Sequence, residues 1–338
     1  MGSNEIKLSR RDLMKAAGAV AGAGALGALT GGPAFAAGYP DRNINIYVPT
    51  ASGGGADRNM RAFTGVWKKY LDTNYEPSFF PGAAGRVGYE TFMGKAEADC
   101  YNLIFGNMGP EVLNWVVKPP SFPADSYHYF LQVDADPACV FTARSSKLQT
   151  IDDIVAEGKK RTLNVATSRL AHPASLGALV LAQKTGAKFN LVPLSGGRNT
   201  RTGVSTGEVD FGVLPASSVI TAADLKVVML FDDTNPLPDR MPDAVLSNEH
   251  YKLGLPPLVA GARAFGIQNA AAEKYPDRYK ALVETSRKVF DDPDYKAAVI
   301  ATKAPWEFIK YGDTAACNKY VAWITELGNE YKALLAGG

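Results

Sequence analysis

The stretch NIYVPTASGGGADRNMRAFTGVWKKYL, residues 45–71, predicts a strand, a glycine-rich loop and a helix in succession. Residues 45–49 are β-prone, and from residue 58 to residue 71 apolar side chains recur at the spacing of one helix face. Asp57 is placed to cap the first helical turn with its carboxylate. Unpaired amides and the positive end of the helix dipole favour anion binding at such a junction.

The same alternation of strands and helices continues along the chain. Predicted strands cover residues 101–105, 140–142, 163–166, 189–193 and 209–214, and predicted helices cover residues 86–96, 151–157, 173–184, 271–290 and 314–335. This order indicates an α/β protein with mostly parallel sheets covered on both faces. Ligands of such sheets bind beyond the carboxyl ends of the strands, so the candidate sites are the turns at residues 50–57, 106–109, 167–172 and 194–199.

Residues 1–36 have the pattern of an export signal. The pair Arg10-Arg11 precedes an apolar, Gly- and Ala-rich run over residues 16–32, and Ala34-Phe35-Ala36 fits a cleavage site. The pair resembles the twin-arginine signal of bacteria and predicts a periplasmic protein, with the signal cleaved near Ala36. A membrane anchor is the alternative, but glycines interrupt the run, and it falls short of the roughly 20 apolar residues of a span.

The charge balance excludes several functions. The 338 residues include 36 Lys+Arg and 34 Asp+Glu, and the signal holds four of the positive and two of the negative charges, which leaves 32 of each in the mature chain. A neutral chain is not built mainly to bind nucleic acid or an anionic membrane. Cys100, Cys139 and Cys317 lie far apart without a CxxC pair. Scattered cysteines of this kind are usually buried as small apolar residues. The alternative is that two of the three form one disulfide bond.

Motifs for catalysis, metals and cofactors are absent from the sequence. The three histidines, His128, His172 and His250, are not at metal-ligand spacing, and the HExxH, GxSxG and phosphate-loop patterns do not occur. The acidic pairs at residues 152–153, 232–233 and 291–292 stand at helix starts or turns, which indicates capping. We therefore expect neither an enzyme nor a bound metal or cofactor.

Five segments, taken in order, resemble the Bug or TctC-like periplasmic receptors of tripartite tricarboxylate transporters. The first contains Pro49, Gly53-Gly54, Asp57 and Arg61 at ungapped spacing. The others are PGAAGRVG at residues 81–88, ADCYNLI at 98–104, Val192-Pro193 with Gly196, and GEVD at 207–210. Two positions depart from the family pattern, since Cys100 replaces a glycine and Gly203 an aspartate.

The resemblance implies a type II periplasmic binding protein with two α/β lobes and a two-crossing hinge. Residues 37–140 and 256–338 would form lobe 1, and residues 141–255 lobe 2. The implied function is that of a monomeric extracytoplasmic receptor. It would bind a di- or tricarboxylate or an aromatic carboxylate in the cleft and deliver it to integral-membrane transporter subunits. An exported enzyme and a ligand-sensing receptor for a two-component kinase are the alternatives.

The resemblance also implies that amides and small hydroxyls at the facing loops hold the ligand carboxylate. The predicted ligand-binding residues are Ser52, Gly53, Gly54, Gly55, Ala56, Asn107, Thr167, Ser168, Arg169, His172, Ser195, Gly196 and Gly197. Arg169 is a candidate for a bidentate clamp on a carboxylate, with Arg198 and Arg86 as further candidates. His172 fits a ligand role and helix-end packing equally well. Phe79-Phe80 fit a pocket wall or the core.

Overall fold

The computed structural model describes residues 38–336 and contains two β-sheets. The signal sequence and its predicted cleavage site lie outside the described residues. The first sheet has the strand order β13-β4-β12-β3-β1-β2. Its strands are β1 (Ile44–Val48), β2 (Tyr75–Phe79), β3 (Asn102–Asn107), β4 (Tyr127–Asp134), β12 (Arg263–Gln268) and β13 (Ile309–Gly312).

The second sheet has the order β10-β9-β5-β8-β6-β7, and β11 pairs with β5. Its strands are β5 (Asp136–Ala143), β6 (Leu163–Thr167), β7 (Phe189–Pro193), β8 (Phe211–Pro215), β9 (Leu225–Leu230), β10 (Val245–Leu246) and β11 (Val259–Gly261). The expectation of mostly parallel sheets is wrong, because both sheets are mixed. The parallel pairs are β1 with β2 and β3, β6 with β7 and β8, and β9 with β10. By contrast, β12 and β5 are antiparallel to their neighbours.

The chain passes between the sheets at two single residues. Ala135 separates β4 from β5, and Ala262 separates β11 from β12. The first sheet therefore takes its strands from both ends of the described chain, and the second takes the strands between them. The lobe limits at residues 140 and 256 stay a prediction.

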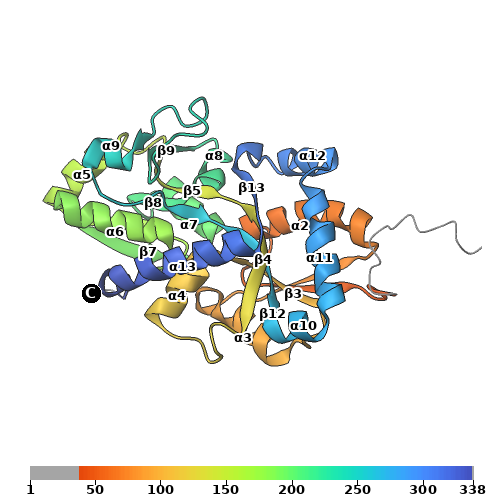
Figure 1. Ribbon diagram of the computed structural model, residues 1–338. Helices are drawn as coiled ribbons and strands as arrows, with labels where there is room; N and C mark the ends of the chain where they lie inside the picture. Colours follow the sequence, from red (N-terminus) through yellow and green to blue (C-terminus); the bar gives the residue numbers. More distant parts are fainter. Residues whose placement is uncertain (1–37, 337–338) are drawn as a thin grey trace, which may run out of the picture. The chain divides into compact units, whose positions relative to one another are not determined.

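Helices accompany both sheets (Figure 1). They are α2 (Gly55–Leu71), α3 (Arg86–Lys95), α4 (Met108–Val117), α5 (Ile151–Lys160), α6 (Pro173–Thr185), α7 (Gly197–Ser205), α8 (Ala216–Ile220), α9 (Ser247–Tyr251), α10 (Asn269–Lys274), α11 (Pro276–Val289), α12 (Pro293–Ala301), α13 (Thr314–Glu330) and α14 (Lys332–Leu335), with 3₁₀ turns η1 (Ala83–Gly85) and η2 (Trp306–Phe308).

The first sheet is covered on both faces because neighbouring residues of a strand point to opposite sides. On β3, Ile104 packs in an apolar cluster with Tyr89 of α3 and Trp115 of α4. The ring of the next residue, Phe105, packs at a tilt against Phe265 of β12, whose ring contacts aromatic residues of α2. The strand ends of this sheet are therefore held between two packed layers.

The second sheet is likewise buried on both faces. On β5, Val140 belongs to a cluster with residues of α5 and α6, whereas Cys139 and Phe141 belong to a cluster with residues of α7 and α8. The cluster of Val140 also contains Ile324 of α13 and Leu335 of α14. The end of the chain thus links the two sheets, and in Figure 1 α13 runs from β4 toward α6.

Two predicted helices are interrupted. The run expected over residues 271–290 breaks into α10 and α11 at Tyr275, whose φ is −130° and ψ is 63°. The cause is Pro276, because a proline disfavours helical dihedrals in the preceding residue and fits the first position of a new helix. The run over residues 314–335 similarly divides into α13 and α14 at Tyr331.

The capping interpretation of the acidic pairs is confirmed where the structure shows it. Asp153 forms a capping box with Thr150 at the start of α5, and Asp292 caps α12 by accepting the N–H of Asp294. These carboxylates are thereby explained by local structure.

Candidate functional site

The predicted turns of the two sheets meet around one cavity of about 770 Å³. From the first sheet come residues 49–52 and 54–56, which follow β1, and Asn107 at the end of β3. From the second sheet come residues 168–172 after β6 and residues 193 and 195–199 at the end of β7 and beyond. All four turns that the sequence indicated therefore contribute to the wall.

The structure brings most of the predicted ligand-binding residues to this wall. Those lining the cavity are Ser52, Gly54, Gly55, Ala56, Asn107, Ser168, Arg169, His172, Ser195, Gly196 and Gly197. Gly53 and Thr167 do not line it. The N–H of Gly53 donates to Asp57 Oδ2 at 2.7 Å, and the buried hydroxyl of Thr167 bonds Ser175 Oγ at 2.6 Å and the carbonyl of Arg169 at 3.0 Å. Both residues therefore stabilise the turns through hydrogen bonds and do not contact the cavity.

Asp57 is not the N-cap of α2, and that prediction is wrong. The helix begins at Gly55 with Gly54 as its cap, so Asp57 is the third helical residue. The glycines allow the helix to start three residues earlier than the side-chain pattern indicates. The carboxylate instead binds back to Gly53 and accepts a hydrogen bond from Arg61 Nε at 2.6 Å.

Four helices begin at the cavity. Their N-caps, Gly54 of α2, Asn107 of α4, His172 of α6 and Gly196 of α7, all line it. The first amides of a helix have no acceptor within the helix, and the helix dipole is positive there. The first amides of α2 and α7 have no acceptor among the described residues, whereas Met108 of α4 donates to the carbonyl of Ala262 and Ala174 of α6 to His172, so α2 and α7 offer the free donors that attract negative charge.

The structure defines the proton position on His172. Its Nδ1 accepts the N–H of Ala174 at 3.1 Å, so the neutral ring carries its proton on Nε2. Burial, and then the charges of Arg169 and Arg263, lower the pKa of His172 to about 3. His172 therefore caps α6 as a neutral ring. The sequence suggested either helix-end packing or a ligand role for His172. The residue packs at a helix end and also lines the cavity.

The charged side chains of the wall are all cationic. Lys118, Arg169, Arg198 and Arg263 line the cavity, and its described lining contains neither Asp nor Glu. The excess of positive charge is local, since the mature chain as a whole is neutral. An anion is the ligand that this wall favours.

Arg169 joins the two sides of the cavity. It follows β6 of the second sheet, and its Nη1 donates to the carbonyl of Ala84 at 2.8 Å and to Oε1 of Glu111 at 3.0 Å. Glu111 belongs to α4, is 1% exposed, and has an Oε2 without a partner among the described residues. Burial raises the pKa of Glu111, and Arg169 opposes that shift. One amino group of the predicted clamp is thus engaged within the protein.

The other residues that the sequence suggested lie in different places. Arg86 lies outside the cavity lining and donates to the carbonyls of Lys118 and Pro119 at the end of α4. Phe79 and Phe80 also lie outside it, and Phe80 stacks on Tyr47 at 5.4 Å. Core packing therefore accounts for Phe80, while Arg198 remains at the cavity.

Arg263 lines the cavity and was missed by sequence reasoning. It is the first residue of β12, is 5% exposed, and pairs through Nη1 with Asp134, while its own N–H donates to Asp134 Oδ1 at 2.7 Å. The sequence carries one relevant signal, a β-prone run around residues 263–268, but nothing local shows that this strand returns to the middle of the first sheet.

Two aspartates that flank the chain crossing at Ala135 lie beside Arg263, which follows the other crossing at Ala262. Asp134 ends β4 and also accepts from Asn59 Nδ2 at 2.8 Å. Asp136 begins β5, has an oxygen 4.0 Å from Arg263 Nη1, and accepts hydrogen bonds from the N–H and hydroxyl of Ser217. Burial raises the pKa of Asp136 to about 7, with Arg263 lowering it and Asp134 raising it further.

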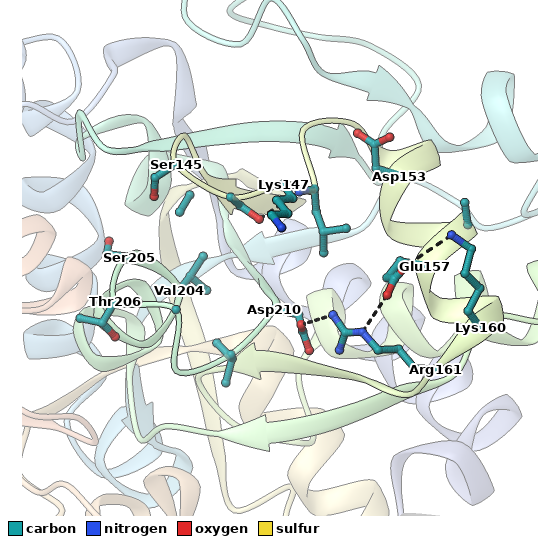
Figure 2. A pocket seen from close by; sticks show the side chains of 16 residues that line it. Ser145, Lys147, Asp153, Glu157, Lys160, Arg161, Val204, Ser205, Thr206 and Asp210 are labelled. Carbon is teal, nitrogen blue, oxygen red and sulfur yellow. Dashed lines mark hydrogen bonds and ion pairs between the residues drawn. The ribbon is translucent and has the colours of Figure 1, made fainter.

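A second cavity, of about 570 Å³, has a different character (Figure 2). Its charged groups include both signs and pair with one another. Arg161 donates to Glu157 at 2.9 Å and to Asp210 at 2.7 Å, and Lys160 lies 3.4 Å from Glu157. Because its ions are largely satisfied internally, this cavity is a weaker candidate for a charged ligand.

Residues 38–336 contain neither a cluster of metal ligands nor a helix that could span a membrane. Within this range no three His, Cys, Asp or Glu side chains gather as a metal site. His128 bonds Asn269 and Tyr279, and His250 bonds Asp152, away from the cavity lining. None of the described helices has the length and apolar character needed to cross a bilayer. Cys100, Cys139 and Cys317 are buried and free.

Solved structures share this arrangement of sheets and helices. A TctC solute-binding protein from Polaromonas is 18% identical, with a TM-score of 0.64 over 89% of this chain and 100% of that one. MatC from Rhodopseudomonas palustris with bound malate is 18% identical, with a TM-score of 0.71 over 87% and 100%. R. palustris Rpa4515 with adipate is 17% identical, with a TM-score of 0.75 over 88% and 98%.

The fold is that of the two-lobed periplasmic binding proteins. The predicted fold class is thereby confirmed. The twin-arginine translocation pathway signal sequence matches residues 7–27, which confirms the predicted route of export to the periplasm. No curated protein matches the sequence.

Proposed function

We propose that the chain is a Bug or TctC-like solute receptor that binds a small organic acid between its two sheets. The export signal, the fold and the order of sequence motifs all support this function. The observation that carries the proposal is the cavity wall, which combines four cationic side chains with four helix N-termini. A carboxylate in this position would accept hydrogen bonds from amides and guanidinium groups.

The size of the cavity and its two-sided wall favour a dicarboxylate. A volume of about 770 Å³ falls within the usual range of small-molecule sites. Helices α2 and α4 begin beside the first sheet, and α6 and α7 begin beside the second, so each side offers donors to one carboxylate group. Malate and adipate, which two structural neighbours hold, are acids of this class.

Thermal unfolding tests the proposal. The purified mature chain is heated with malate, adipate, citrate and benzoate, each beside its neutral methyl ester or amide. An acid at 100 times its Kd stabilises the folded state by about 2.7 kcal/mol, which raises Tm, whereas its neutral analogue leaves Tm unchanged. If folded protein shows equal shifts with acids and neutral analogues, or none with any acid, carboxylate recognition is rejected.

Delivery to a membrane transporter of the tripartite tricarboxylate type is part of the same proposal. The expected partners are integral-membrane subunits that bind the acid-loaded receptor. A cross-linking experiment with membranes that contain such subunits, run with and without the acid identified above, tests this step. Partner capture that is independent of the acid would contradict delivery.

A further inference from the structure

Part of the guanidinium group of Arg263 faces the cavity and has no hydrogen-bond partner among the described residues. Its side chain is almost fully buried, yet Arg263 lines the cavity wall. On the inner side Nη1 pairs with Asp134, and Asp136 lies 4.0 Å away. Within the described part of the chain, Nε and Nη2 have no hydrogen-bond partner. A guanidinium group offers five N–H donors, and neither Nε nor Nη2 is among the fully enclosed atoms that lack a partner, so both are accessible from the cavity.

This part of the guanidinium group points toward the start of α2. A Cβ placed on Gly55 would lie 3.0 Å from Nη2 of Arg263, so the guanidinium stands directly beside the first helical residue. The amides of Gly55 and Ala56 have no acceptor among residues 38–336. Glycine at position 55 therefore leaves open the approach that a larger side chain would crowd.

Two other arginines show what distinguishes Arg263. Arg161 is bonded to carboxylates through both Nε and Nη2, as Figure 2 shows. Arg169 shares Nη1 between Glu111 and the carbonyl of Ala84 across the cavity. Arg263 is anchored from behind by Asp134 and keeps its forward donors free, which is the geometry of a preorganised anion site.

We propose that Arg263 is the carboxylate-binding residue of the cavity, and that it holds the ligand together with the first amides of α2. One carboxylate oxygen accepts from Nη2 of Arg263, and the same group accepts from the N–H of Gly55 or Ala56. This inference rests on the proposed function, since it names the group that recognises the acid.

The position of Arg263 gives the contact a consequence for the hinge. Arg263 follows the crossing residue Ala262, and its partners Asp134 and Asp136 flank the crossing residue Ala135. Asp136 is bonded in turn to Ser217 of α8 in the second sheet's layer. A charge bound to Arg263 therefore acts on the residues through which both crossings pass.

Acetate, a small carboxylate probe, tests the site without knowledge of the natural ligand. In ¹⁵N-labelled mature chain, the Arg263 Nε–H resonance is assigned by its absence from the Arg263→Lys spectrum. We expect acetate to shift this resonance and the amides of Gly55 and Ala56 along one saturable curve, and neutral acetamide to leave them in place. An Arg263 resonance that does not respond to acetate, or responds equally to acetamide, overturns the proposal.

Variants separate the contact from a general loss of charge. Arg263→Lys keeps a cation beside Asp134 but loses the planar fork, so acetate binding to the α2 amides should weaken about tenfold or more. Arg161→Lys is the matched control and should bind acetate as the wild type does. Equal affinity in Arg263→Lys rejects the contact. If Arg263→Lys does not fold, resonances assigned by sequential connectivities in the wild type decide the question.

The acetate experiment tests the role of Arg263, and the acid panel tests the receptor function, so either can fail without the other. A panel acid that raises Tm while the Arg263 resonance stays unmoved would preserve the receptor function and reject Arg263 as its anchor. An acetate response at Arg263 without any panel acid raising Tm would preserve Arg263 as a carboxylate site and reject the panel acids as its ligands.

Discussion

The ion pair of Arg169 and Glu111 connects the second sheet to a helix of the first sheet. The side chains are 13% and 2% exposed, and the pair joins the loop after β6 to helix α4. A carboxylate so deeply buried is unfavourable unless a cation compensates it. The same guanidinium cannot give all its donors to a ligand, because Nη1 serves Glu111 and Ala84.

Replacing Arg169 with alanine should destabilise the chain by about 3 kcal/mol, since it leaves Glu111 buried without its partner. The double variant Arg169→Ala/Glu111→Gln should recover most of the loss, because a neutral amide replaces the unpaired charge. Urea unfolding of the two single variants and the double variant measures the coupling. Additive effects of the two changes would show that the pair does not stabilise the fold.

Asp136 should make stability depend on pH. Its folded-state pKa of about 7 lies above the ordinary value of 3.8, so the folded chain holds a proton that the unfolded chain has lost. The contribution is fully present below about pH 4 and is lost as pH rises to about 7, and it amounts to about 4 kcal/mol at most. Asp136→Asn removes this titration. Parallel stability curves of the wild type and Asp136→Asn between pH 4 and pH 8 would contradict the assignment.

At the scale of elements, glycines decide how closely helices approach the sheets. On α6, a Cβ at Gly177 would lie 2.7 Å from ring atoms of Phe231. On α2, a Cβ at Gly65 would meet no atom within 4 Å. The first glycine permits a close contact, whereas the second only adds freedom to the unfolded chain.

This difference predicts opposite effects of one substitution. Gly177→Ala should cost about 1–3 kcal/mol because the methyl group overpacks the contact with Phe231. Gly65→Ala should stabilise by about 0.5–1 kcal/mol because it favours the helix and restricts the unfolded chain. Chemical unfolding of both variants gives the comparison. A gain in stability from Gly177→Ala would show that α6 has room to shift.

Local sequence predicted the elements that carry strong periodicity and the turns that end them. The β1 strand, the glycine loop and α2 lie close to their expected positions, and Cys100 takes a φ of 67°, which explains why the family pattern has glycine there. Local patterns could not predict which strands pair in the sheets or which residues far apart in the sequence come into contact. Arg263 and Asp136 meet only because β12 and β5 follow the two crossings, more than 120 residues apart in sequence.

At the scale of the whole molecule, charge is balanced overall but unevenly distributed. The mature chain carries 32 charges of each sign, yet the cavity wall gathers four cations. A chain without net charge gives little long-range steering of small anions, so the selection of a ligand depends on the groups inside the cavity.

Because its three cysteines are buried, the folded protein should not react with thiol reagents. Burial raises the pKa of Cys100 and of Cys317 to about 12, and it raises that of Cys139 as well. Ellman's reagent should therefore find almost no thiol in the native chain and all three after denaturation. A cysteine introduced at exposed Leu170, on the rim of the cavity, would then be the single labelling position. A fluorophore attached there turns the native protein into an optical sensor for its own ligand.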